Sequence, residues 1–65
     1  MFLIQALHSD GWRSQGTFRL EYWACLEAQT RSCSDGRTYR IVNQENQAVV
    51  CMLDNSSCKA LSPLH

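Results

Sequence analysis

The alternation of apolar and polar positions is clearest between residues 35 and 53 and predicts a β-hairpin. Residues 37–42 (RTYRIV) are rich in side chains that suit a pleated surface. A turn at Asp35-Gly36 precedes them, and the polar residues 43–46 follow as the hairpin loop. Residues 48–53 (AVVCML) form an unbroken apolar run, which is typical of a strand covered on both faces. We therefore expect residues 48–53 to be the central strand of a sheet.

The amino-terminal segment contains one further predicted strand, at residues 2–8, where the composition is compatible with β-structure. Ser9, Asp10 and Gly11 end this strand with a turn. Residues 12–16 are polar apart from Trp12, and we expect a connecting loop there, with residues 17–19 extended.

Residues 20–32 are expected to form a helix, because they are rich in Ala, Leu, Glu and Gln. Helical spacing predicts one face packed on the sheet, and its members are Phe18, Tyr22, Cys25, Leu26, Gln29 and Cys33. The alternation of Phe18, Leu20 and Tyr22 leaves a second possibility open, in which a strand runs through Trp23.

Together these elements predict a small α+β domain with the order β-α-β-β over residues 1–53. The simplest arrangement is a three-stranded antiparallel sheet with the helix on one face and residues 48–53 in the centre. The alternative is an all-β, four-stranded meander. Residues 54–65 contain Ser56, Ser57 and Pro63 and are expected to be a mostly irregular tail.

The run from Phe18 through Tyr22 and Trp23 to DGRTYRIVN, followed by QAVV, resembles many short bacterial and phage proteins of unknown function. Those proteins have a helix, a "YRVV" strand, a polar turn and a final apolar strand. The resemblance covers about half of the chain and implies the strand–helix–hairpin arrangement. It implies no activity for any residue, and a phage or mobile-element origin is an expectation from size and style.

Size and charge narrow the classes of function. The 65 residues carry six basic and six acidic side chains, so the formal net charge is zero. A general binder of nucleic acid or membrane would carry a basic excess. A chain of this size buries only about 60% of its unfolded surface, so a covalent staple or a partner subunit is commonly needed.

The four cysteines, Cys25, Cys33, Cys51 and Cys58, leave three states open: free thiols, disulfides or zinc ligands. Structural zinc sites usually use cysteine pairs about two to four residues apart, and no pair here has that spacing. The amino terminus lacks a basic segment and a long apolar stretch, so we expect a cytoplasmic protein with reduced thiols. Cys25 and Cys51 are then expected to pack in the core.

No motif predicts catalysis or a cofactor, since only two histidines could serve as bases and no glycine-rich phosphate loop is present. We expect a non-enzymatic protein. A nucleic-acid or nucleotide binder is one alternative, in which Arg31, Arg37, Arg40 and Tyr39 would form the binding surface. A disulfide- or zinc-stabilised secreted peptide is another.

Surplus apolar surface points instead to protein–protein interaction. If the helix covers Tyr39, Ile41, Val49, Cys51 and Leu53, the opposite sheet face presents Val42, Val50 and Met52. Trp23 lies off the predicted buried face of the helix, and Arg40 would border the patch. Such patches usually mark interfaces. The sequence therefore predicts a small protein-interaction module, expected to be a homodimer, and an inhibitor or regulator from a phage or mobile element would fit its size.

Overall fold

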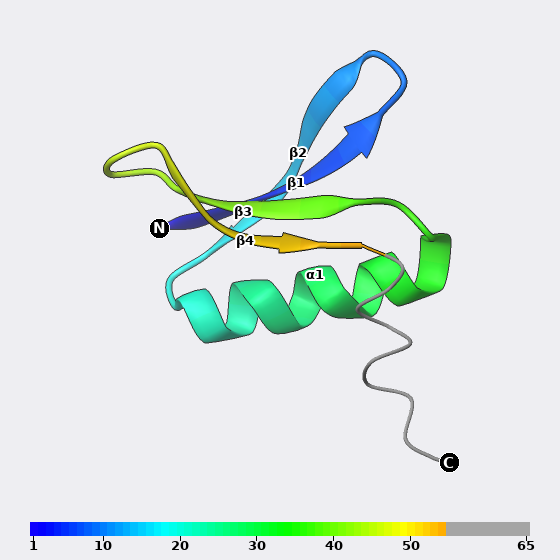
Figure 1. Cartoon of the computed structure of the whole chain (residues 1–65). Coiled ribbons are helices and arrows are strands. Elements are labelled where there is room, and N and C mark those ends of the chain that lie inside the picture. Colours follow the sequence, from blue (N-terminus) through cyan, green and yellow to red (C-terminus); the bar gives the residue numbers. More distant parts are fainter. Residues whose placement is uncertain (55–65) are drawn as a thin grey trace.

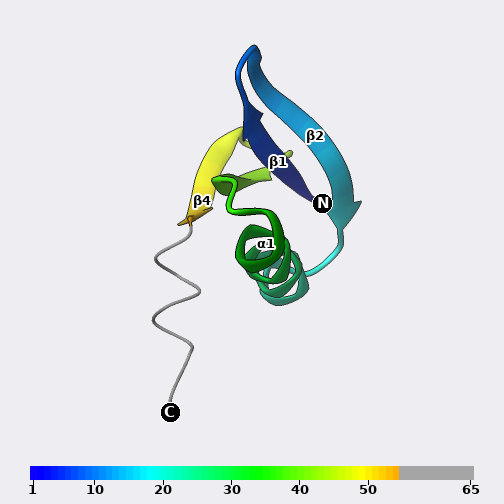
Figure 2. The ribbon, with the colours of Figure 1, turned by 90° about the vertical axis from the view of Figure 1, so that its right-hand side faces the viewer.

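The computed structural model, which describes residues 1–54, has one helix packed on one face of a four-stranded antiparallel sheet (Figure 1). The elements in chain order are β1 (Phe2–His8), β2 (Gly11–Phe18), α1 (Glu21–Asp35), β3 (Tyr39–Asn43) and β4 (Ala48–Leu53). The strand order is β2-β1-β3-β4. Figure 2 views α1 nearly end-on and shows it on one side of the sheet. The α+β class is confirmed, but the three-stranded sheet is wrong. The alternative, the all-β meander, had the correct number of strands, four, but was wrong in having no helix. The expected irregular tail lies outside the described residues, apart from Asp54.

The additional strand is β2, which the sequence suggested was mostly a loop. A two-residue turn at Ser9 and Asp10 brings Gly11 opposite His8, and pairing continues as far as Phe18 opposite Phe2. The strand is exposed over most of its length. Because backbone hydrogen bonds hold an edge strand while its side chains remain in water, its polar composition did not prevent pairing.

The central strands are β1 and β3, and β4 is an edge strand. Val49 and Met52 of β4 are 47% and 59% exposed, whereas Ile41 of β3 is fully buried. The single helix covers only one face of the sheet. The other face of β4 is therefore exposed, although its side chains are apolar as well. The expectation that residues 48–53 lie in the centre is therefore wrong, although their extent as a strand is confirmed.

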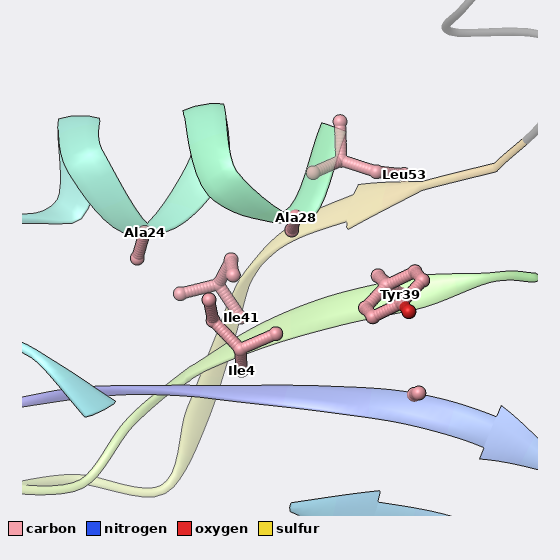
Figure 3. Packing of buried hydrophobic residues seen from close by; sticks show 7 residues of the cluster. Ile4, Ala24, Ala28, Tyr39, Ile41 and Leu53 are labelled. Atoms are coloured by element: carbon pink, nitrogen blue, oxygen red, sulfur yellow. The ribbon is translucent and has the colours of Figure 1, made fainter. Parts of the chain in front are cut away.

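Of the face predicted to pack on the sheet, Phe18 and Cys25 do pack against the core, but the fully buried stripe of α1 consists of other, small side chains. Ala24, Ala28 and Ser32 are fully buried, while Tyr22 is 68% exposed. Figure 3 shows Ala24 and Ala28 directed towards Ile41 and Ile4 of the sheet. Side chains four residues apart share one helix face, and small ones allow the helix to approach the sheet closely. Close approach leaves Tyr22 and Leu26 outside.

The connection from α1 to β3 is fixed by a set of hydrogen bonds. Gly36 has a φ of 72°, and its N–H donates to the Ser32 carbonyl at 2.8 Å, ending the helix. The buried Ser32 hydroxyl donates to the Arg37 carbonyl at 2.8 Å. The Asp35 carboxylate accepts from the Arg37 N–H at 2.9 Å and from the Tyr39 hydroxyl at 2.7 Å. These contacts fix the direction of the chain between the end of α1 and the start of β3, so that β3 runs beneath the helix.

Candidate interaction surface

The sheet face opposite α1 has no other described element against it, and we call it the open face (Figure 2). Cross-strand partners point to the same side of a sheet, so the register gives its composition. One row across three strands is apolar: Leu3, Val42 and Val49. The next row is Gln5, Arg40 and Met52. The candidate surface therefore combines an apolar row with one arginine beside it.

A β-bulge changes which residues of β4 reach the open face. Ile41 pairs with Cys51 but Val42 pairs with Val49, so Val50 is the extra residue in β4. Strict alternation had placed Val49 under the helix, and this is wrong, because the bulge moves it to the side of Val42. No feature of the sequence indicated the bulge. Val42 itself is only 7% exposed, since Leu3 and Val49 flank it, so the expectation that it is displayed is also wrong.

Arg40 links three strands across the open face. Its Nε donates to Gln5 Oε1 at 2.7 Å, and its guanidinium carbon lies 4.2 Å from the centre of the Trp12 ring. Trp12 pairs with Leu7 and so belongs to the same face. The sequence suggested that Trp12 lay in a loop, although a turn directly after a strand is itself a hairpin signal. Arg40 is therefore half-buried and engaged with its neighbours.

The free edge of β4 adjoins the apolar row. Ala48, Val49, Val50 and Met52 are all exposed, and no charged residue interrupts the strand. No described strand pairs with its outer side. An edge strand presents unpaired backbone N–H and C=O groups that another chain can extend. Edge and open face meet at Val49 and Met52, and we call these two features together the β4 surface.

Trp23 does not lie on the β4 surface. Successive helical residues are about 100° apart around the axis. Ala24 faces the sheet and Cys25 lies beside Cys51 of β4, so Trp23 projects on the opposite flank of α1. There it is 52% exposed and makes an edge-to-face contact with Tyr22. The structure brings together Arg40, Val42, Val50 and Met52 of the predicted contact residues, and separates Trp23 from them.

The residues proposed for nucleic acid do not form one surface. Tyr39 is 3% exposed, and its hydroxyl is bonded to Asp35, so its ring is not available to stack on a base. Burial and the Asp35 carboxylate raise the pKa of Tyr39 to about 12. Arg31 is paired with Glu27 on the helix at 2.7 Å, whereas Arg40 lies on the open face. Arg37 is exposed in the turn before β3.

The cysteines of the described segment are thiols: Cys25 and Cys51 are half-buried and Cys33 is exposed. Within residues 1–54 no three side chains of His, Cys, Asp or Glu lie together as metal ligands would, and no pocket is present. Cys58 lies outside the described residues. The candidate site is therefore a surface, not a cavity.

No helix among residues 1–54 has the length and apolar composition needed to cross a membrane. The chain matches no protein-family model, no curated protein and no solved structure.

Proposed function

We propose that this chain is a small, non-enzymatic protein-interaction module that binds an extended strand of another protein through the β4 surface. The single observation that carries the proposal is the position of β4 at the edge of the sheet, exposed, apolar and without a charged residue. Natural edge strands are normally protected by charge, proline or a covering element. A partner strand would gain backbone hydrogen bonds at the edge and apolar contact with Val49 and Met52.

A second copy of the chain is the simplest partner. Antiparallel pairing of β4 with itself about a twofold axis places apolar residues against apolar residues, as an isologous interface requires. The zero net charge offers little electrostatic resistance to this association. An inhibitor or regulator of a host protein would use the same surface with a foreign strand.

The test compares two lysine substitutions in the same cross-strand row. Met52→Lys places a charge on β4, and Ser14→Lys places one at the other edge, on β2. Both side chains are exposed, so both variants are expected to fold. We expect sedimentation equilibrium to show a dimer for the wild type and for Ser14→Lys, and at least about tenfold weaker association for Met52→Lys.

If the wild type is a monomer, the same three proteins serve as baits for a host lysate. A partner captured by the wild type and Ser14→Lys but not by Met52→Lys supports the proposal. Trp23→Ala is the second control, because Trp23 lies on another surface. Loss of binding with Trp23→Ala and not with Met52→Lys would overturn the assignment to β4, as would the absence of any association that distinguishes the two lysine variants.

A further inference from the structure

Cys25 of α1 and Cys51 of β4 both lie at the helix–sheet interface. Cys51 pairs in register with Ile41, whose fully buried side chain lies under α1, so Cys51 points to the same side. Cys25 directly follows Ala24, which is also fully buried against the sheet. Both cysteines are half-buried, both are thiols, and both pack against the same core cluster.

Burial, together with the neighbouring Cys51 thiol, raises the pKa of Cys25 to about 12. Cys25 is therefore protonated at neutral pH, and a protonated thiol is a poor nucleophile.

We propose that Cys25 and Cys51 form a redox-active pair whose oxidation to a disulfide joins α1 to the edge strand β4. The oxidant is a small disulfide such as glutathione disulfide. One cysteine of the pair loses its proton and attacks one sulfur of it, forming a mixed disulfide and releasing one glutathione thiolate, which takes up a proton. The other cysteine then loses its proton and attacks the protein sulfur of the mixed disulfide, and the second glutathione leaves as a thiol. Two protein thiols are oxidised and one glutathione disulfide is reduced to two thiols.

The cross-link would close the chain from residue 25 to residue 51, which includes most of α1, all of β3 and the hairpin loop. Such closure removes conformations from the unfolded chain, and a small domain with a limited core benefits most. Cys51 points towards α1, so the disulfide leaves the exposed side chains of the β4 surface in place. This inference is therefore independent of the proposed binding function.

The experiment uses the full chain with Cys33→Ser and Cys58→Ser, which leaves the proposed pair as the remaining cysteines. The folded, reduced protein is incubated with reduced and oxidised glutathione at several ratios, and the products are identified by mass and by peptide mapping. We expect an intramolecular Cys25–Cys51 disulfide and a rise in Tm of roughly 10 °C or more. A matched variant with Cys25→Ala and Cys58→Ser retains Cys33 and Cys51, and we expect no intramolecular disulfide in it.

Two outcomes would overturn the proposal. One is that the two-cysteine variant keeps both thiols, or yields only glutathione adducts and intermolecular dimers, at every ratio. The other is that peptide mapping of the oxidised wild type shows Cys25 or Cys51 joined to Cys33 or Cys58. Because the wild type carries no substitution, this second measurement does not depend on the folding of any variant.

Discussion

The two edge strands of the sheet, β2 and β4, differ in how their outer edges are protected against pairing with another chain. Among residues 1–54 no strand pairs with the outer side of either, and each contains one bulge, at Gln15 in β2 and at Val50 in β4. In β2 the exposed side chains are mainly polar, and Arg13 is paired with Asp10 at 2.7 Å. In β4 they are Ala, Val and Met. Since both strands are bulged, side-chain chemistry is what distinguishes them, and it leaves β4 as the edge suited to pairing.

The open face shows the same asymmetry. Towards β2, Arg40 holds Gln5 by a hydrogen bond and the Trp12 ring by a cation–π contact. Towards β4, the cross-strand neighbours of Val42 and Arg40 are the apolar Val49 and Met52. Figure 1 also shows that the tip of the β1–β2 hairpin bends away from α1. The open face thus has polar contacts on the β2 side and exposed apolar side chains on the β4 side.

The largest expected effect tests how each edge strand is attached to the core. Leu53 of β4 is 9% exposed and belongs to the core cluster, so Leu53→Ala should lower the free energy of unfolding by about 3 kcal/mol. Gln15→Ala in β2 should change it by less than about 0.5 kcal/mol, because Gln15 is exposed. Urea denaturation of both variants measures the difference. Equal effects would mean that the two edges are attached alike.

A smaller effect on the free energy of unfolding is expected at Tyr39, the first residue of β3. Tyr39 lies opposite Leu53, and its hydroxyl donates to Asp35, so Tyr39→Phe should destabilise the fold by about 1 kcal/mol at neutral pH. Burial acts to raise the pKa of Asp35, but hydrogen bonds from the Arg37 N–H and the Tyr39 hydroxyl outweigh it and hold that pKa below its ordinary value.

The pH dependence of this contact has a definite sign. The pKa of Tyr39 is raised to about 12, above the ordinary tyrosine value of about 10. Between these values the unfolded chain has lost the proton and the folded chain keeps it, so the contribution of Tyr39 falls as the pH rises. Urea midpoints should therefore decrease more steeply for the wild type than for Tyr39→Phe. Cys25 titrates in both proteins, and its effect cancels in the difference. Parallel curves would contradict the prediction.

Replacing Arg40 should loosen one side of the sheet more than the other. Arg40→Met keeps an unbranched stem like the aliphatic part of arginine but removes the hydrogen bond to Gln5 and the contact with Trp12, a loss of about 1 kcal/mol. We expect faster amide hydrogen exchange in β2 than in the wild type and little change in β4. Faster exchange in β4 alone would show that Arg40 does not act as the link to β2.

The smallest effect is expected at the Asp10–Arg13 pair next to the β2 turn. The hydrogen bond from Arg13 lowers the pKa of Asp10, but both side chains are well exposed. Solvent and salt screen such pairs, so Asp10→Asn should leave the urea midpoint unchanged within error. A clear shift that disappears at high salt would show that β2 depends on this charge pair more than its exposure indicates.

Local sequence determined the element boundaries well where side-chain chemistry and backbone geometry agree. The strand at residues 2–8 and the strand at residues 48–53 are as predicted, and the helix begins within one residue of its expected start. The helix ends at Asp35 and not at residue 32, because the glycine that adopts the required positive φ is Gly36. Of the predicted contact residues, Val50 and Met52 are exposed and adjacent to the sheet edge, whereas Val42 is covered by its cross-strand neighbours.

The sequence by itself determined the hairpin that follows Gly36 and favoured a helix before it, since propensity and turn chemistry act over a few residues. Only the tertiary structure decided that Gly11–Phe18 is a strand, that β4 is an edge, and that Ala24, Ala28 and Ser32 are the buried helix face. Strand order depends on which hairpins dock beside each other, and the buried helix face depends on how closely the helix approaches the sheet. The bulge at Val50 is set by pairing with β3. Each of these is a property of two segments together.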